Sequence, residues 1–546
     1  MSARLVNHAV LLGAMLVLSS CHSVAPPQAV PVSAPPTQVA ARPPSTARLE
    51  PRALPGPSIA PLNAMQRFRG SLDSMVADPQ FSNAHWGILI VDPERGDTLY
   101  AHNDGKLFMP ASNQKIVTSA VALTQLGADY RWRTVVEMRG ATKAHIFRGD
   151  VIVRGRGDPS WSDAMQGGAA ISALSPIVDA LAARGITRIE GSVIAEGNAF
   201  SDEPTGFGWA FDDFDFGYSA PVDELLFNEG FFVVMVRAGQ RPGGRVTVST
   251  KPTLTYPNVV VRAVARERND TLRENRTIEV KWDSTATAVV VNGTLPLGDS
   301  VNVEVAYRHP NDAAIAAIVE AIKARGIRVV TPPIKKAART QAKSGLGTIV
   351  SIRAPDTLVV LTSPPLRDVL KRLEKPSQNQ MAEALYKTVA LEKTGIGRAD
   401  SARALVQRQL VAWGIPPEGI AVRDGSGLSR HDYIAPRTIV RILDIMRTSL
   451  SFDALYAALP IAGIDGTIAN RMKGTAAENN VHAKTGTVDK ARSLSGYVTT
   501  ADGHMLIFSM LCNNYTVPTR AVERVQDAIA VRLANMRLRD AQSEQK

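Results

Sequence analysis

The alternation of apolar and polar positions becomes that of a folded domain from Ala64 onward. The stretch WGILIVDPERGDTLYAH (86–102) has two apolar runs around a Pro/Gly turn and predicts a β-hairpin, and Pro110 then begins a helical pattern. Near the other end, residues 491–514 predict two strands around an Ala-Asp-Gly turn, followed by an amphipathic helix from about Thr519. Both ends can therefore close into one domain, with the middle of the chain inserted into it.

The middle of the chain repeats one pattern. IVDALAARGITRI (177–189) and IVEAIKARGIRVV (318–330) share an amphipathic helix, an Arg-Gly stop and a following strand, so we interpret them as one unit used twice rather than as a coincidence between helix ends. Between them, residues 242–306 hold strand-like runs such as RVTVST, TIEVKW and VNVEVAY. This predicts a small all-β domain inserted into an α/β domain.

These patterns predict an α+β fold in which a discontinuous outer domain of strands and helices contains an inserted α/β domain that itself carries the small all-β domain. The expected outer domain covers 64–135 and 350–540, the α/β domain 136–241 and 307–349, and the β domain 242–306. A chain of 546 residues, 45% hydrophobic and 21% charged, is long enough for several such cores.

The first residues are typical of an export signal. Arg4 precedes the apolar run AVLLGAMLVL, which is too short to span a membrane but suits a secretory signal, and the run ends in Leu18-Ser19-Ser20-Cys21. That string resembles a bacterial lipobox, in which a signal peptide (here 1–21) is cut before a cysteine that is then lipidated. An ordinary signal peptide that ends near a cysteine is the alternative.

Cysteine usage favours the lipid anchor. The only cysteines are Cys21 and Cys512, and Cys512 lies in the apolar run MLIFSMLC, where we expect a buried thiol rather than a disulfide partner. Residues 22–63 are rich in proline and predict an extended, disordered tether. We therefore expect a periplasmic protein anchored to the cell envelope through Cys21. His22 stands where an aspartate often retains lipoproteins in the inner membrane, which favours the outer membrane.

The formal net charge of +11 suits an anionic partner, such as lipid headgroups or a wall polymer. The Lys and Arg residues are scattered and form no basic block, so we expect no nucleic-acid partner. No metal-ligand cluster and no phosphate-binding glycine loop stands out in the sequence, so we expect neither a metal nor another cofactor.

The candidate chemistry begins at MPASNQKIVTSA (109–120). Ser112 and Lys115 lie three residues apart, so on a helix they share a face and the amine can reach the hydroxyl. Ser-x-x-Lys alone also occurs by chance in a chain of this length. A lysine acts as a base only if burial or a neighbouring cation lowers its pKa, so the motif predicts a second cation nearby.

HAKTGTVDK (482–490) supplies a candidate cation in Lys484, which is followed by Thr485, Gly486 and Thr487 just before the C-terminal strand pair. Gly486 would let a substrate backbone approach closely, and an edge strand here can hold an extended peptide by β-augmentation. A solvated charge on an edge strand is the alternative for this lysine.

A third motif, Ser377-Gln378-Asn379, precedes a helix with an apolar face. Taken alone, Ser377 and Asn379 can be helix caps. The order Ser-x-x-Lys, Ser-x-Asn, Lys-Thr-Gly is, however, the motif set of penicillin-binding proteins and serine β-lactamases, and three chance motifs in this order are far rarer than one.

On these motifs the sequence resembles the three-domain low-molecular-mass penicillin-binding proteins, the D-alanyl-D-alanine carboxypeptidase/endopeptidase family. The long gap from Lys115 to Ser377 matches a family in which two domains are inserted between the first two motifs, and it differs from β-lactamases, where the gap is far shorter. GDPSW (157–161), RDGSGLSR (423–430) and PIAGIDGTIANR (460–471) are similar to further strings of the family. The resemblance covers the chain beyond the tether and implies that the outer domain is a β-lactamase/transpeptidase-like catalytic domain, an antiparallel sheet with helices.

The resemblance also implies roles for the motif residues. Ser112 would be the acylated nucleophile, and its backbone N–H, with that of Thr487, would form the oxyanion hole. Lys115 would be the general base. Ser377 would relay a proton toward the leaving group, and Asn379 would hold the substrate's amide and help to position Lys115.

The third motif would bind the end of the substrate. Lys484 would lower the pKa of Lys115 and, together with Thr485, bind the terminal carboxylate of the peptide. Gly486 and Thr487 would complete the substrate-binding strand.

The implied reaction is a two-step acyl transfer on a peptidoglycan stem peptide, through an ester on Ser112 that water resolves, and β-lactams would inhibit it as stable adducts. A carboxypeptidase releases free D-alanine and an endopeptidase releases a cross-linked peptide, and both stay open. The alternatives are a serine β-lactamase or esterase, for which motif spacing marks no deacylating glutamate, and a non-catalytic cell-wall scaffold. A scaffold has no physical reason to keep the serine, both lysines and the asparagine together.

Overall fold

The computed structural model describes residues 63–268, 277–330 and 355–538. The predicted signal peptide, the lipidation site at Cys21 and all but the last residue of the tether lie outside these residues. Within the described ranges, no helix is long and apolar enough to cross a membrane.

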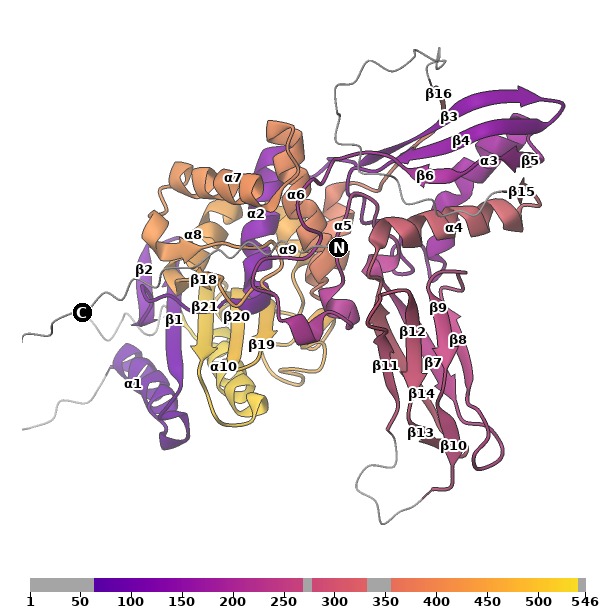
Figure 1. Ribbon diagram of the computed structural model, residues 1–546. Coiled ribbons are helices and arrows are strands. Elements are labelled where there is room, and N and C mark those ends of the chain that lie inside the picture. The colour runs from indigo at the N-terminus through magenta and orange to yellow at the C-terminus, as the bar shows by residue number, and fades with distance from the viewer. Residues whose placement is uncertain (1–62, 269–276, 331–354, 539–546) are drawn as a thin grey trace, which may run out of the picture. The chain divides into compact units, whose positions relative to one another are not determined.

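Both ends of the described chain contribute to one five-stranded antiparallel sheet, in the order β19-β20-β21-β1-β2 (Figure 1). Its strands are β1 (His85–Asp92), β2 (Asp97–His102), β19 (His482–Val488), β20 (Ala491–Thr499) and β21 (Met505–Asn513). The pairing of β1 with β21 joins the two ends of the chain, with Trp86 opposite Cys512. The predicted hairpin, the C-terminal strand pair and the buried Cys512 thiol are confirmed.

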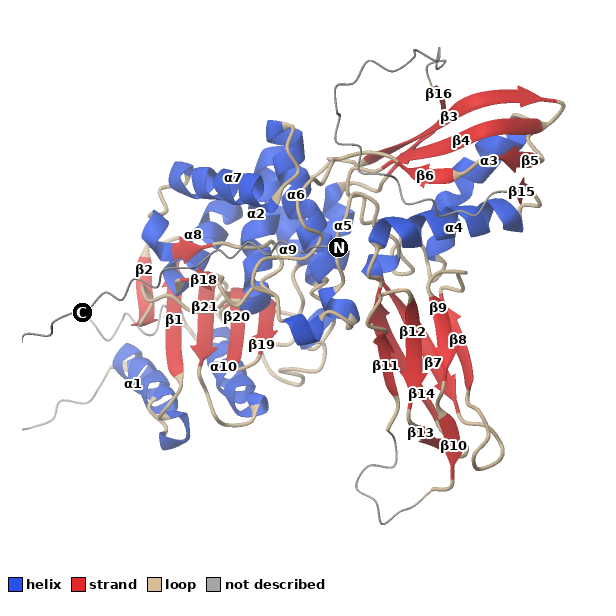
Figure 2. Cartoon of the chain, viewed as in Figure 1, coloured by secondary structure: helices blue, strands red, loops and turns tan. Residues whose placement is uncertain are grey.

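Helices cover both faces of this sheet (Figure 2). Alternate side chains of β1 point to opposite faces of the sheet. Ile88 and Ile90 therefore pack in one core with α1 (Ala64–Val76) and α10 (Thr519–Asn535), whereas Leu89 packs in a second core on the other face. The helices of that other core are α2 (Gln114–Leu126), α5 (Leu366–Glu374), α6 (Asn379–Thr394), α7 (Ala399–Ala412), α8 (Pro436–Arg447) and α9 (Phe452–Ala458). A short pair, β17 (Ile420–Ala421) and β18 (Tyr433–Ile434), lies between α7 and α8 in the chain. The helix predicted from about Thr519 is confirmed.

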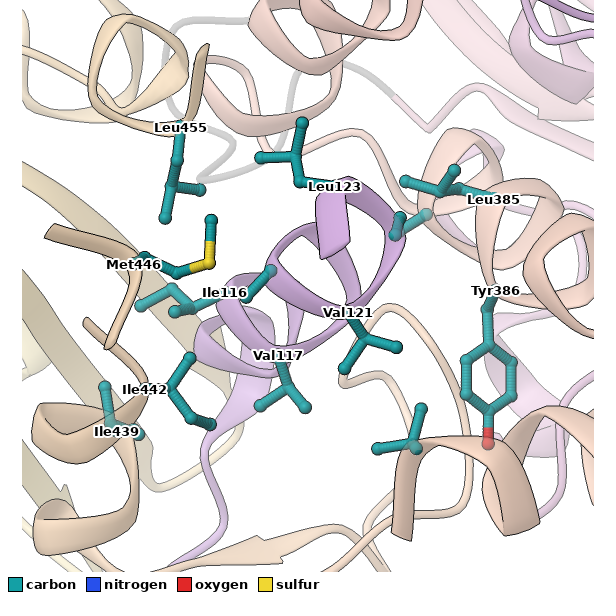
Figure 3. Close-up of a cluster of buried hydrophobic side chains, with 14 of the residues drawn as sticks. Ile116, Val117, Val121, Leu123, Leu385, Tyr386, Ile439, Ile442, Met446 and Leu455 are labelled. Carbon is teal, nitrogen blue, oxygen red and sulfur yellow. The ribbon is translucent and has the colours of Figure 1, made fainter. Parts of the chain in front are cut away.

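Helix α2 is surrounded by the other helices, and most of its residues are buried (Figure 3). Its side chains Ile116, Val117, Val121 and Leu123 pack with Leu385 and Tyr386 of α6, Ile439, Ile442 and Met446 of α8, and Leu455 of α9. Each fully buried aliphatic side chain of this kind contributes about 1.5–3 kcal/mol. This packing holds the first turn of α2 in place between the sheet and α6.

A second sheet has the order β15-β5-β4-β3-β16, with β6 beside β4. Its strands are β3 (Arg133–Lys143), β4 (Ile146–Arg154), β5 (Arg188–Glu190), β6 (Val193–Ala195), β15 (Arg328–Val329) and β16 (Asp356–Thr362), and its helices are α3 (Ser175–Ala183) and α4 (Pro310–Ala324). Both copies of the repeated pattern form a helix followed by a strand, as predicted, and the two strands, β5 and β15, pair in parallel.

The remaining strands form smaller sheets, in the orders β14-β7-β8, β11-β12-β9 and β10-β13. They are β7 (Phe231–Arg237), β8 (Thr247–Lys251), β9 (Asn258–Val261), β10 (Val264–Arg266), β11 (Glu279–Trp282), β12 (Ala288–Asn292), β13 (Thr294–Pro296) and β14 (Ser300–Ala306). Their apolar side chains share one core that includes Phe232, Trp282 and Tyr307. The strand-like runs predicted in this part of the chain are confirmed as strands.

Strand pairing crosses two of the borders that we expected between domains. β7 pairs with β8 and β14, so the small β region begins at Phe231 and not at 242. β16 pairs with β3, so the sheet of the inserted α/β region extends to Thr362 and not only to 349. Each sheet is completed by a strand that lies far away in the sequence. The α+β class is confirmed, and the division into domains stays a proposal with these two borders moved.

Candidate active site

Ser112 lies in a short 3-10 turn (Ala111–Asn113) directly before α2. Pro110 precedes this turn as predicted, and Ala111 has a positive φ of 47°, a conformation that costs a non-glycine residue energy. The turn presents Ser112 half-buried at the wall of a cavity. Lys115 follows in the first turn of α2, so the two residues share one side of the chain, as their spacing predicts.

Lys115 is fully buried, and its ammonium group has three hydrogen-bond acceptors. Nζ donates to Ser112 Oγ at 2.9 Å, to Asn379 Oδ1 at 2.6 Å and to the Ser426 carbonyl oxygen at 2.7 Å. The first two sequence motifs therefore meet at one nitrogen atom.

Burial lowers the pKa of Lys115 to about 8, because the charged ammonium loses its hydration inside the protein. Nearby carboxylates, Glu374 first among them, raise that pKa and limit the shift. The predicted second cation is present, and burial followed by the charge of Lys115 lowers the pKa of Lys484. Desolvation, rather than the charge of Lys484 that we expected, is thus the principal cause of the lowered Lys115 pKa.

Asn379 begins α6, and the two ends of its amide have different partners. Oδ1 accepts from Lys115, and Nδ2 donates to the Tyr218 carbonyl at 2.7 Å, which fixes the orientation of the amide. The helix cap is Gln378, whose side chain accepts from a backbone N–H of the first turn at 2.8 Å, so the capping alternative is wrong for Ser377 and Asn379. Ser377 has a positive φ of 68° and lines the cavity.

Strand β19 carries the third motif. Lys484 is fully buried, and its Nζ donates to the Thr485 carbonyl at 3.0 Å. The Lys484 carbonyl accepts from Asn113 Nδ2 at 2.8 Å, which ties the strand to the turn that carries Ser112. The alternative of a solvated charge is therefore wrong for Lys484, although β19 is the edge strand of the sheet.

A buried carboxylate stands close to the two buried lysines. Glu374, the last residue of α5, is fully buried, accepts from Ser119 Oγ at 2.6 Å and interacts electrostatically with Lys484 and Lys115. Burial raises the pKa of Glu374, and the two lysines lower it. Sequence reasoning missed this residue, since its place beside the lysines depends on how α5 packs against α2.

Two buried carboxylates hold the loop that supplies the Ser426 carbonyl. Glu383 accepts from the backbone N–H groups of Gly425 and Ser426, at 3.0 and 2.7 Å. Asp424 accepts from two further N–H groups of the same loop, each at 2.7 Å. Sequence reasoning noted the string RDGSGLSR but gave its residues no role. The sequence feature that could have identified this loop is an aspartate beside glycines and serines, a composition typical of loops whose side chains accept hydrogen bonds from their own backbone N–H groups.

A cavity of about 570 Å³ joins these elements. Six of the predicted residues line it: Ser112, Ser377, Asn379, Thr485, Gly486 and Thr487. Other lining residues include Asp213, Tyr218, Arg430 and Thr467, and the Thr467 and Thr485 hydroxyls share a hydrogen bond of 2.7 Å. Lys115 and Lys484 are buried beside these lining residues. The remaining predicted site residue, Cys21, lies outside the described residues.

Comparison with known proteins assigns this arrangement to a family. Residues 68–536 match the model of the D-Ala-D-Ala carboxypeptidase 3 (S13) family. The chain belongs to this S13 family. The D-alanyl-D-alanine carboxypeptidase of Actinomadura sp. (strain R39) is 32% identical over 489 residues, which are 86% of this chain and 85% of the relative.

Other relatives of this S13 family member span similar shares of its length. D-alanyl-D-alanine carboxypeptidase DacB of Haemophilus influenzae is 25% identical over 458 residues, 80% of this chain and 87% of the relative. The crystal structure of penicillin binding protein 4 (dacB) from Haemophilus influenzae matches with a TM-score of 0.70 at 23% identity, over 85% of this chain and 99% of that chain. The predicted family, the β-lactamase/transpeptidase-like fold and the enzyme class, a D-Ala-D-Ala carboxypeptidase and so a hydrolase, are confirmed.

Gly486→Ala is expected to slow acylation of this S13 enzyme by a β-lactam. A Cβ at Gly486 would lie 2.1 Å from Ser493 Oγ, 2.5 Å from the Pro110 carbonyl oxygen and 3.0 Å from the Ser112 nitrogen. Relieving these overlaps would move β19 away from the Ser112 turn. An overpacking cost of about 1–3 kcal/mol that is borne by the transition state lowers the rate roughly 5- to 150-fold. The rate of labelling by a fluorescent penicillin measures the effect.

The matched control for this glycine is Gly70→Ala in α1, where an added Cβ meets no atom within 4 Å. We expect that variant to be labelled at the parent rate. Labelling of Gly486→Ala at the parent rate would contradict the close fit of β19 against the turn.

Proposed function

We propose that Ser112 is the acylated nucleophile of a carboxypeptidase that acts on peptidoglycan stem peptides, with Lys115 as its general base. The observation that carries the proposal is the 2.9 Å contact of Lys115 Nζ with Ser112 Oγ at the cavity wall, together with the lowering of the Lys115 pKa to about 8 by burial. A lysine with such a pKa is neutral in a useful fraction of molecules near neutral pH, so it can accept the serine proton.

In the first step, Ser112 Oγ attacks the carbonyl carbon of the penultimate D-alanine as its proton passes to Lys115. Negative charge develops on the carbonyl oxygen, and the backbone N–H groups of Ser112 and Thr487 would stabilise it as an oxyanion hole. Two observations support this assignment. Both residues line the same cavity, and the bond from Asn113 Nδ2 to the Lys484 carbonyl holds β19 against the turn.

The leaving amine must receive a proton as the C–N bond breaks. Ser377 lines the cavity and Asn379 bonds to Lys115, which supports transfer of the proton from Lys115 to the amine through the Ser377 hydroxyl, with Asn379 holding the substrate amide. A water molecule then attacks the ester, with Lys115 as base, and regenerates Ser112. The released group is D-alanine in a carboxypeptidase reaction and a cross-linked peptide in an endopeptidase reaction.

The terminal carboxylate of the peptide would bind at the third motif. Lys484 is buried close to the cavity, where burial and the charge of Lys115 lower its pKa to about 7, and a bound carboxylate would favour its charged form. Thr485, Gly486 and Thr487 line the cavity. The Thr467 hydroxyl, bonded to that of Thr485, adds a further polar group at this end. Such a site suits an extended peptide that ends in a carboxylate.

We propose that β-lactams inhibit the enzyme by acylating Ser112. A β-lactam presents an amide carbonyl and a carboxylate, the same two groups that the peptide presents to the site. The related penicillin binding protein 4 (dacB) of Haemophilus influenzae has been crystallised in complex with a novel β-lactam, which supports the proposal.

We also propose that residues 1–21 are a signal peptide, that Cys21 carries a lipid anchor, and that the enzyme is periplasmic, on the side of the outer membrane. These assignments rest on the sequence alone. The proline-rich residues 22–63 would then let the folded enzyme reach the cell wall from the membrane surface.

The rate of acylation is expected to rise with pH from about pH 6.5 to about pH 9, as the neutral form of a base with a lowered pKa becomes populated. The base is Lys115, whose pKa burial lowers to about 8, so that its neutral form becomes populated over this range. Because Lys115 and Lys484 interact, the profile reports the titration of the pair. A pH profile of kcat/KM for a chromogenic β-lactam or a thioester substrate measures the rise, and a profile flat over this range would contradict the role of Lys115.

The test of the proposed function uses the purified chain from Cys21 onward, without lipid. Release of D-alanine from a D-Ala-D-Ala pentapeptide is expected, together with a stable fluorescent penicillin adduct on the proteolytic fragment that contains Ser112. Turnover of the drug without a stable adduct would favour the β-lactamase alternative. A folded protein that neither releases D-alanine nor reacts with penicillin would leave the scaffold alternative.

A further inference from the structure

Residues 206–218, GFGWAFDDFDFGY, form a loop rich in aromatic residues, here called the aromatic loop. Two hydrogen bonds fix it to the active site. Trp209 Nε1 donates to Asp424 Oδ2 at 2.9 Å, and the Tyr218 carbonyl accepts from Asn379 Nδ2 at 2.7 Å. The loop is therefore a wall of the active site, although it belongs to the long insertion between the first two motifs.

The aromatic loop exposes large rings to solvent. Phe211 is 85% exposed and Phe207 is 63% exposed, and Phe216 and Tyr218 are exposed as well. Phe216 and Tyr218 stack with their ring planes 6° apart, and Phe207 lies against the ring of His431. Although three of these rings have a ring partner, each keeps a large part of its surface in water, and a group of exposed rings on an anchored loop is typical of a binding surface.

The two most exposed rings of the loop, Phe207 and Phe211, lie close in the chain to residues that line the cavity. Ala210, Asp213 and Tyr218 of the aromatic loop line the cavity, and the neighbouring Phe207 and Phe211 do not. A substrate longer than the cavity must therefore cross adjacent surface as it leaves. The peptidoglycan stem peptide is such a substrate, because its other end is bonded to a sugar of the glycan strand.

We propose that the aromatic loop binds the glycan strand of polymeric peptidoglycan through Phe207 and Phe211, an inference that rests on the proposed function. Sugar rings present flat faces of C–H groups that pack on aromatic rings, and their hydroxyl and N-acetyl groups need hydrogen-bond partners beside those rings. Asp212, which follows Phe211, is exposed and offers such an acceptor. The loop thus makes the enzyme prefer the polymer over a free peptide of the same sequence.

The experiment compares D-alanine release from purified, pentapeptide-rich sacculi and from a soluble pentapeptide. The Phe207→Ala/Phe211→Ala double variant is expected to act on sacculi roughly tenfold more slowly, because stacking on two rings is lost. Its kcat/KM for the soluble peptide is expected to stay within about twofold of the parent, because neither ring lines the cavity. Leu450→Ala, which removes an exposed apolar side chain outside the cavity lining, is the matched control and is expected to change neither rate.

A second readout separates binding from turnover. In a Ser112→Ala background, the double variant is expected to co-sediment with sacculi less than the protein with both rings. An equal loss of rate on sacculi and on the soluble peptide would overturn the glycan assignment. Unchanged rates together with unchanged co-sedimentation would also overturn it, and the rings would then serve another partner, such as a protein or a membrane. Failure of the parent to release D-alanine from the soluble peptide and to react with penicillin would instead overturn the proposed function itself.

Discussion

Ser112→Ala is expected to abolish covalent labelling by penicillin and to lower D-alanine release by roughly 10⁴-fold or more, the size of effect seen when an essential nucleophile is removed. The reason is geometric: the Ser112 hydroxyl lies at the cavity wall and accepts from Lys115 Nζ at 2.9 Å. Because Lys115 keeps its bonds to Asn379 and Ser426, the fold should survive. Mass spectrometry of the adduct and thermal denaturation of both proteins measure the two outcomes.

The matched control is Ser74→Ala, which removes an exposed α1 serine that bonds only to a carbonyl of its own helix, at 2.8 Å. This variant should be labelled at the parent rate. An adduct that forms on Ser112→Ala as fast as on the parent would contradict the assignment and would direct attention to Ser377, the other motif serine at the cavity.

The sequence was sufficient to predict which motif residues the structure brings together at the cavity, because each motif is a short string. Ser112 and Lys115 are linked by helical spacing, and Lys484 is marked by the Thr and Gly that follow it. These short motifs do not reveal how deeply each side chain is buried or which groups surround it. Burial of Lys115 comes from α6 and the loop near Ser426, hundreds of residues away in the chain, so the main cause of its lowered pKa was missed.

The same limit explains the residues that sequence reasoning did not find. Glu383 accepts hydrogen bonds from the backbone N–H groups of Gly425 and Ser426, which lie 42 and 43 residues later in the chain. Tyr218 contributes only its backbone carbonyl, which any residue could supply. Neither leaves a local pattern. Two of the expected domain borders cut across strand pairs for a related reason, because only the distant partners of β7 and β16 decide which sheet each strand joins.

Lys115→Met is expected to lower the acylation rate roughly a thousandfold, within the range that a general base contributes. Methionine is close to lysine in length and needs no hydration, so it can occupy the same buried position. The substitution leaves Asn379 Oδ1 and the Ser426 carbonyl oxygen without this donor. We therefore expect the free energy of unfolding to fall by about 1–3 kcal/mol for each unpaired acceptor. Slow labelling of Ser112 should persist, in contrast to Ser112→Ala, because the nucleophile is still present.

The pH profile separates loss of the base from general damage to the site. If Lys115 takes the proton, the residual rate of Lys115→Met should no longer rise around the pKa of about 8 that burial gives this lysine. A variant that is merely distorted would keep the same rise at a lower rate. Lys393→Met, which alters an exposed lysine near the end of α6, should keep both the parent rate and the parent profile. Retention of the rise in Lys115→Met would therefore transfer the role of base to another group of the site, with Lys484, whose pKa burial also lowers, as the next candidate.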